Sequence, residues 1–180
     1  AYAPSLVELQ REERKIHKIP VRMPSNEIAY INPGGQNKLI KSMVEEFCPR
    51  FAPGGQVLYI GDADSKTSNY NKELLSSLGI NLDMHGKMPD LVVYQKDKNW
   101  LFLMEAVTTH GPVNPLRKKD LESLFGESKA GIVYVSCFPN RRVLRSHLMD
   151  IAWETEVWLE SDPTHMIHFN GSRFMGPHES

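Results

Sequence analysis

Residues 87–107 read KMPDLVVYQKDKNWLFLMEAV, and this stretch gives the clearest indication of the fold. It holds two apolar runs, at residues 91–94 and 100–107, whose lengths and compositions predict buried strands. The polar tetrapeptide KDKN at 96–99 separates them, and so short a linker predicts an antiparallel hairpin. Asp90 begins the first strand and Glu105 lies near the end of the second, so the hairpin should bring both carboxylates to one end of the sheet.

Other segments add strands and helices in the order of an α/β fold. Apolar runs predict strands at residues 57–60, 131–138 and 165–169, and helices are expected at about 36–51, 70–79, 115–125 and 140–150. The stretch IAWETEVWL at 151–159 fits both periods poorly. The helix at 115–125 joins two strands, which predicts a crossover and a parallel pair. We therefore expect an α/β fold, with a mixed central sheet flanked by helices.

The composition is that of a globular protein that does not bind nucleic acid through bulk charge. The 180 residues include 21 Lys and Arg against 22 Asp and Glu, and 41% are apolar. No apolar run is long enough for a transmembrane helix, so no membrane association is expected. Cys48 and Cys137 lie in apolar stretches, which indicates buried thiols in a reducing, cytoplasmic compartment. A nucleic-acid partner would need a local basic patch.

The first 30 residues differ from the rest. Residues 11–22 carry five Lys and Arg against two Glu, a net charge of +3. We expect residues 1–30 to form a basic arm or linker, or the end of a preceding domain that this sequence lacks, and residues 31–180 to form the main domain.

Glu105 is the one charged residue within the apolar run from Leu101 to Val107. A buried carboxylate is costly unless it is paired or binds a metal. One interpretation is a structural salt bridge. The other is a Mg²⁺ site shared with Asp90, because Mg²⁺ takes oxygen ligands and usually keeps waters and a substrate phosphate.

The chain resembles a known nuclease family. Proline-aspartate at a strand start and a glutamate on the next strand look like the PD-(D/E)XK nuclease core, and five motifs resemble the BsuBI/PstI family of type II restriction endonucleases in the family's order. These motifs are EEFCPRFAPGG (45–55), KMPDLVVY (87–94), LFLMEAVTTHGPVNP (101–115), IAWETEVW (151–158) and HMIHFNG (165–171). The resemblance spans residues 31–177 and implies the catalytic domain of a prokaryotic, Mg²⁺-dependent enzyme.

The same resemblance implies a substrate and roles for individual residues. The substrate would be double-stranded DNA, cut at a specific short palindromic site by a homodimer. Asp90 and Glu105 would be metal ligands. Members of this core often add an acidic residue from the first helix, and Glu46, which borders the apolar stripe, is the candidate, whereas Glu45 should be solvated.

The sequence departs from the family signature at one position. A lysine should follow the glutamate by two residues, and Val107 stands there. Either another residue replaces this lysine or the metal alone activates the water. Lys66 is the leading substitute, followed by Lys87 and His110.

Two basic clusters are candidates for phosphate contacts, and the alternative for each is a solvated helix face. They contain Arg117 and Lys118 in one helix and Arg141, Arg142 and Arg145 in the next. Two other functions also stay open. Val107 would suit a nuclease-like fold that binds DNA without cutting it. The stretch VLYIGD at 57–62 also resembles the first strand of a nucleotide-binding α/β enzyme such as a methyltransferase, although only one glycine follows the strand.

Overall fold

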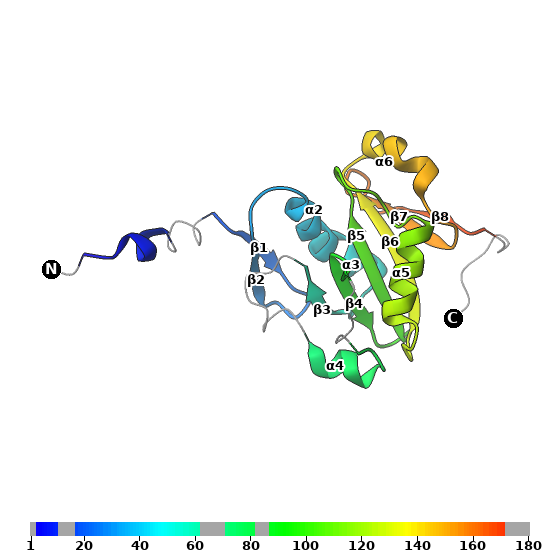
Figure 1. The fold of residues 1–180 in the computed structure, drawn as a ribbon, viewed down its shortest axis with the longest axis horizontal. Helices are drawn as coiled ribbons and strands as arrows, with labels where there is room; N and C mark the ends of the chain where they lie inside the picture. The colour runs from blue at the N-terminus through cyan, green and yellow to red at the C-terminus, as the bar shows by residue number, and fades with distance from the viewer. Residues whose placement is uncertain (1–2, 11–16, 62–70, 82–86, 172–180) are drawn as a thin grey trace.

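The structure is a computed structural model, which describes residues 3–10, 17–61, 71–81 and 87–171 (Figure 1). In this part of the chain, six strands form a mixed sheet in the order β3-β4-β5-β6-β7-β8. The strands are β3 (Gln56–Ile60), β4 (Leu91–Gln95), β5 (Trp100–Ala106), β6 (Gly131–Phe138), β7 (Thr155–Leu159) and β8 (Met166–Phe169). The pairs β5–β6 and β6–β7 are parallel and the others antiparallel. The expected mixed α/β sheet is confirmed.

The central hairpin and the crossover also follow the expectation. β4 and β5 pair from Leu91↔Met104 to Gln95↔Trp100, with residues 96–99 as the turn. Helix α5 (Pro115–Phe125) leads from β5 to β6, and the Asn114 side chain caps it by accepting a hydrogen bond from the Arg117 N–H at 2.7 Å. Because β3 and β5 are both antiparallel to β4, the end of β3, the start of β4 and the end of β5 meet at one end of the sheet.

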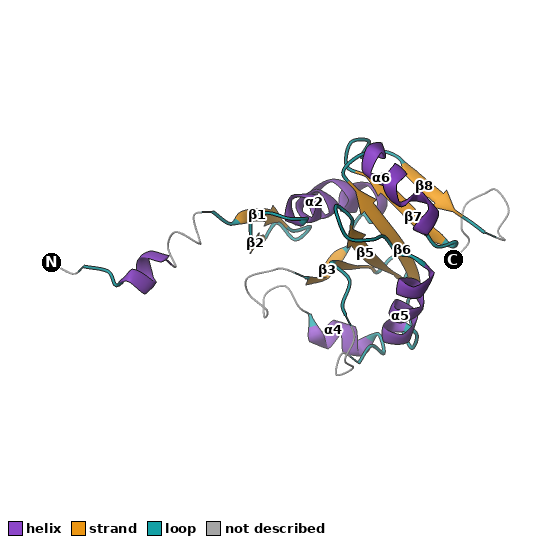
Figure 2. Cartoon of the chain, turned by 45° about the horizontal axis from the view of Figure 1, so that its top comes forward, coloured by secondary structure: helices purple, strands orange, loops and turns teal. Residues whose placement is uncertain are grey.

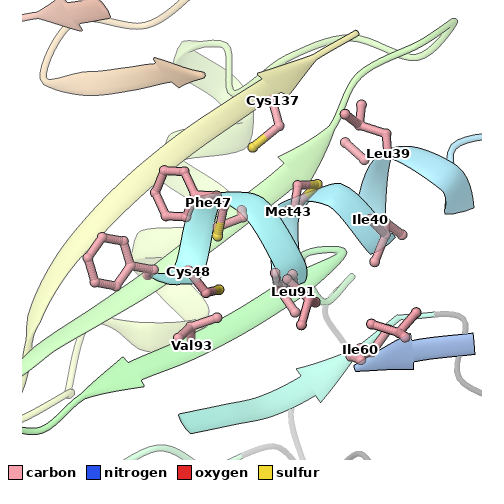
Figure 3. Close-up of a cluster of buried hydrophobic side chains, with 14 of the residues drawn as sticks. Leu39, Ile40, Met43, Phe47, Cys48, Ile60, Leu91, Val93 and Cys137 are labelled. Carbon is pink, nitrogen blue, oxygen red and sulfur yellow. The ribbon is translucent and has the colours of Figure 1, made fainter. Parts of the chain in front are cut away.

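Helices cover both faces of the sheet (Figure 2). One continuous helix, made of α2 (Asn37–Ser42), the π-helical η1 (Met43–Phe47) and α3 (Cys48–Phe51), packs on one face. Figure 3 shows its Met43 and Phe47 gathered with Leu91 and Val93 of β4. The other face is covered by α4 (Lys72–Ser77), α5 and α6 (Arg141–His147), and η2 (Leu148–Asp150) follows α6.

Both cysteines lie in the core between the first helix, which carries Cys48, and the sheet, which carries Cys137 (Figure 3). Cys48 and Cys137 are buried free thiols, as expected. Burial raises the pKa of Cys48 to about 12, so this side chain stays protonated and behaves as a small apolar group.

An N-terminal hairpin that the sequence did not reveal adds to the same core. It pairs β1 (Ile19–Arg22) with β2 (Ile28–Ile31), and it buries Val21 and Ile31 completely against the first helix. Each strand has only four residues and buries one face, so its alternating pattern was too short to recognise. The second half of the expected arm at 1–30 is therefore a packed part of the domain.

The ambiguous stretch at 151–159 contains β7, in which all five residues are buried. A strand covered on both faces has no polar side to produce alternation, and this explains why its periodicity was uninformative. No helix within the described ranges is long and apolar enough to span a membrane.

Candidate active site

The hairpin places Asp90 beside Glu105. Leu91 pairs with Met104 in the antiparallel hairpin, so Asp90, one residue before Leu91, faces Glu105, one residue after Met104. Asp90 is held by both of its oxygens: Oδ2 accepts the Ala106 backbone N–H at 2.8 Å, and Oδ1 accepts the Gln36 side-chain amide at 2.9 Å. The Glu105 residue is only 8% exposed. Two carboxylates thus share a largely buried position at one end of the sheet.

Arg117, in the first turn of α5, is the cation next to this pair. Its Nε donates to Glu105 Oε1 at 2.8 Å, and its Nη2 lies 2.6 Å from the same oxygen. Its Nη1 donates to the Lys87 backbone carbonyl at 2.9 Å. The sequence made Arg117 a candidate for contacts with DNA phosphates, and a solvated helix face was the alternative. The structure shows a side chain that is largely buried and pairs with Glu105.

The raised pKa of Glu105 indicates that this pair of carboxylates would be stabilised by a further positive charge. Burial raises the pKa of Glu105 to about 7, and the negative charge of Asp90 contributes to this rise, while Arg117 opposes both effects. One guanidinium therefore does not fully offset the cost of two neighbouring carboxylates. A divalent cation would offset it, so the donor set fits Mg²⁺, which binds through one or two carboxylates together with waters and substrate phosphate.

The carboxylate pair stands without a third side-chain ligand in the described ranges. There, no three His, Cys, Asp or Glu side chains gather closely enough to hold a metal ion. Two carboxylates still suit a Mg²⁺ ion that takes its other ligands from water and DNA. Zinc is a poorer fit, because structural zinc sites use four protein ligands and catalytic ones three.

Val107 offers no polar side-chain atom to the carboxylates. Its side chain is fully buried in an apolar cluster with Phe138 of β6 and Leu144 of α6. Its backbone N–H donates to the Cys137 carbonyl at 2.8 Å. The position of the signature lysine is therefore part of the core.

The proposed replacements for that lysine differ in their placement. Lys66 lies outside the described residues. The last described residue of that segment, Gly61, donates its N–H to the Asp90 carbonyl at 2.8 Å, so the chain leaves β3 next to the site. Lys87 is exposed and lies three residues before Asp90, while His110 is exposed on the loop after β5.

Glu46 does not take the orientation that the sequence suggested. It is half exposed and pairs with Arg50 one turn along the helix at 2.7 Å. Gln36, just before α2, is the residue that reaches Asp90, whereas Glu46 lies ten residues further along the same helix and pairs with Arg50. Within the described ranges Glu46 belongs to no group of three possible metal ligands, so the structure does not support its expected metal role. The wider π-helical turn at residues 43–47 rotates this part of the helix away from an ideal wheel.

Glu45 also differs from its expectation, because it is bonded rather than solvated. It accepts the Arg22 N–H at 2.9 Å and pairs with Lys41 at 3.0 Å. Gln36 carried no sequence signal beyond its position after the turn NPGG, since a single glutamine is not a motif.

Basic side chains lie at the same end of the sheet as the carboxylates. Arg141, Arg142 and Arg145 are exposed on α6, which follows β6, and β6 runs parallel to β5. Lys118 is less available, because it lies 5.6 Å from the Tyr134 ring centre and 3.7 Å from Glu122. Of the two expected clusters, the one on α6 is the more accessible to DNA.

Comparisons with known proteins identify the family of this chain. The family model of the BsuBI/PstI restriction endonuclease domain matches residues 19–172. The chain is 50% identical over 175 residues to the type II restriction enzyme BsuBI of Bacillus subtilis, and 34% identical over 170 residues to the type II restriction enzyme AplI of Arthrospira platensis. These alignments cover 97% and 91% of this chain, but 55% and 52% of the relatives.

A solved structure of the SdaI restriction endonuclease superposes with a TM-score of 0.85 at 47% identity. That match covers 99% of this chain and 56% of the other chain. The chain thus spans about half the length of the relatives that it matches. The likeness leaves no support for a nucleotide-binding enzyme such as a methyltransferase.

Proposed function

Because the chain belongs to the BsuBI/PstI restriction endonuclease family, we propose that it is the catalytic domain of a Mg²⁺-dependent type II restriction endonuclease. It would hydrolyse phosphodiester bonds of double-stranded DNA at a short palindromic site. The observation that carries this proposal is the pair of the partly buried Asp90 and the buried Glu105, side by side at the end of the sheet. The exposed arginines of α6 lie at the same end.

Each residue of the site has a separate role in this proposal. Asp90 and Glu105 would hold Mg²⁺. Gln36 and the Ala106 N–H fix the orientation of Asp90, and Arg117 fixes one oxygen of Glu105. Bound Mg²⁺ would stabilise the charge that develops on the phosphoryl oxygens and lower the pKa of the attacking water. Lys66 would supply the amine that orients this water, since Val107 cannot.

The DNA would lie across the end of the sheet that carries the carboxylates. Arg141, Arg142 and Arg145 would contact its phosphates and fix the register of the domain on the duplex. A homodimer would match the two-fold symmetry of a palindromic site. Such an enzyme would act in the prokaryotic cytoplasm, where its DNA substrate is.

A plasmid-cleavage assay tests this proposal. Wild-type protein should convert supercoiled plasmid to nicked or linear DNA with Mg²⁺ but not with EDTA, and Asp90→Asn should abolish this activity. A second candidate function rests on Val107, which replaces the signature lysine: a DNA-binding module that has lost catalysis. Binding of DNA without cleavage in Mg²⁺ or Mn²⁺ would favour that candidate.

A further inference from the structure

The positive charge beside the carboxylates comes from Arg117 of helix α5 and not from a residue of strand β5. In the family signature, a lysine two residues after the glutamate supplies this charge, but here Val107 is packed against Phe138 and Leu144. A cation that serves the carboxylates must therefore reach them from another element. Arg117 does so from α5, with Nη2 at 2.6 Å from Glu105 Oε1.

The Arg117 side chain is held in one position by two different segments. It contacts Glu105 on β5 through Nε and Nη2, and the Lys87 carbonyl, just before β4, through Nη1. It thus joins the two segments that carry the carboxylates. These contacts with Glu105 use Oε1, which leaves Oε2 for a metal ion shared with Asp90.

This pair differs from ordinary surface ion pairs of the domain. Lys41–Glu45 and Arg50–Glu46 each join neighbouring turns of one helix, and their side chains are between 27% and 49% exposed. The side chains of Arg117 and Glu105 are 16% and 10% exposed and come from different elements. Burying two charges is costly, so a pair at this position calls for a reason other than stability.

The guanidinium also keeps a donor that the protein does not use. Arginine has five N–H groups, and here Nε and Nη1 donate one hydrogen bond each. The buried Nη2 lies 2.6 Å from Glu105 Oε1 and serves that ion pair. The second N–H of Nη1 is therefore the donor that remains for a ligand approaching the carboxylates.

We propose that Arg117 supplies, from helix α5, the fixed positive charge that the nuclease signature places on the strand at position 107. This inference rests on the proposed function above. The second N–H of Nη1 would donate to a phosphoryl oxygen of the DNA bound at Asp90 and Glu105. A fixed cation there stabilises the charge that develops on the phosphate during cleavage.

The role is electrostatic and does not include proton transfer. An arginine stays protonated at all working pH values, so Arg117 is not the base that accepts the proton of the attacking water. The electrostatic role of Arg117 is also separate from the role proposed for Lys66, which is to orient the attacking water. The two residues therefore make different predictions, and their variants can be compared in one assay.

The test compares Arg117→Met, Arg117→Lys and Lys98→Met in the protein. Lys98 is the matched control, because it is exposed in the turn at the opposite end of the β4–β5 hairpin, and its removal changes the net charge equally. Three quantities are measured: the plasmid cleavage rate at saturating Mg²⁺, the affinity of the DNA-free protein for Mn²⁺ by calorimetry, and the melting temperature.

We expect Arg117→Met to cleave about 100-fold or more slowly, as when one preorganised charge donor is lost from an active site. Its Mn²⁺ affinity should be unchanged or tighter, because a positive charge beside the cation has been removed. Arg117→Lys should recover at least about tenfold of the lost rate, since it restores the charge but not the fork. Lys98→Met should match the wild type in cleavage rate and Mn²⁺ affinity, and its melting temperature should fall only slightly, since it loses the contact of Lys98 with the Trp100 ring.

Three results would overturn the inference. The first is a cleavage rate of Arg117→Met within about threefold of the wild type. The second is a parallel loss of cleavage, Mn²⁺ binding and melting temperature, which would assign Arg117 a structural role. The third is an Arg117→Lys variant no more active than Arg117→Met. If the wild type neither cleaves DNA nor binds Mn²⁺, the proposed function fails and the inference fails with it, a result distinct from these three.

Discussion

The Asp90 carboxylate is bonded to the strand that carries Glu105, because its Oδ2 accepts the Ala106 N–H at 2.8 Å. The geometry of the carboxylate pair is therefore set by the hairpin itself, before any metal or DNA binds. Gln36 fixes the other oxygen from the opposite side, since it precedes the helix that covers the sheet. Removing the Asp90 carboxylate should thus affect stability differently from removing the Glu105 carboxylate, although each removal should prevent catalysis.

The first prediction concerns these two carboxylates. Asp90→Ala and Glu105→Ala should each reduce plasmid cleavage by about 10³-fold or more, because each removes a metal ligand worth several kcal/mol in the transition state. Asp90→Ala should also lower the free energy of unfolding by about 1–3 kcal/mol, since it leaves the Ala106 N–H and the Gln36 amide without this acceptor.

Glu105→Gln serves as the milder partner in the same experiment. It keeps the shape of the side chain and removes the charge that repels Asp90, so its melting temperature at pH 8 should equal or exceed that of the wild type. Wild-type cleavage by any of these variants would contradict the metal-site assignment.

A second prediction follows from the raised pKa of Glu105. Its ordinary value of 4.5 applies to the unfolded chain, and burial near Asp90 raises it to about 7 in the folded protein. Between these pH values the folded protein keeps a proton that the unfolded chain has released. The free energy of unfolding should therefore fall as the pH rises from 4.5 to 7, by at most roughly 3 kcal/mol from this group.

Chemical denaturation at several pH values measures this effect. The wild type and Glu105→Gln are compared without divalent ions, so that titration of other groups cancels in the difference. The difference should grow in favour of the glutamine variant as the pH rises. A difference that stays constant from pH 4.5 to 8 would show that folding does not raise the pKa of Glu105.

The sequence predicted those parts of the fold that have strong local patterns. The hairpin, the crossover through α5 and the strand at 131–138 each combine a long apolar run with clear turn or cap residues. The first helix was also found, but the orientation of Glu46 was not, because a π-helical turn breaks the regular period on which a helical wheel depends. The short hairpin β1–β2 and the fully buried β7 lack such patterns.

The site was only partly visible for a related reason. Asp90 and Glu105 stand out because they flank apolar strands, and pairing them requires only a hairpin. Gln36 and Arg117 reach the same point from segments distant in the sequence, and no local pattern marks them. Arg117 looked like one more basic residue on an exposed helix, and the structure shows it directed inward to Glu105.

The third prediction concerns the amine. If Lys66 orients the attacking water, Lys66→Met should lose most cleavage while it keeps metal binding. Lys87→Met should stay active, because the structure uses the backbone carbonyl of Lys87 and leaves the residue exposed. Cleavage rates and Mn²⁺ affinities measured on both variants decide this, and equal activity of Lys66→Met and the wild type would exclude Lys66.

Val107→Lys is a companion to this comparison. A lysine at this fully buried position would place an unpaired ammonium among Phe138 and Leu144. We therefore expect it to destabilise the fold by roughly 3 kcal/mol, measured by denaturation, and not to raise activity. A stable variant with faster cleavage would show that the position can still open towards the carboxylates.

The last prediction concerns DNA binding by α6. With a net charge of −1, the protein can attract phosphates only where its basic residues are concentrated. Charge reversal of Arg141, Arg142 and Arg145 to Glu should weaken binding to all DNA sequences alike, since phosphate contacts carry no sequence information. It should also flatten the plot of log K against log salt, by about one unit of slope for each phosphate that is no longer neutralised.

A matched triple reversal makes this result specific. The control reverses three exposed lysines at the other end of the sheet, near the β4–β5 turn and the start of β6: Lys96, Lys98 and Lys129. Three Lys→Glu changes alter the net charge by as much as the three Arg→Glu changes do. Binding is measured in EDTA, so that no divalent ion is available for hydrolysis, at several salt concentrations. The α6 variant should lose affinity and slope, and the control should lose much less of each. Equal effects of the two variants would mean that only overall charge matters and that α6 is a solvated face.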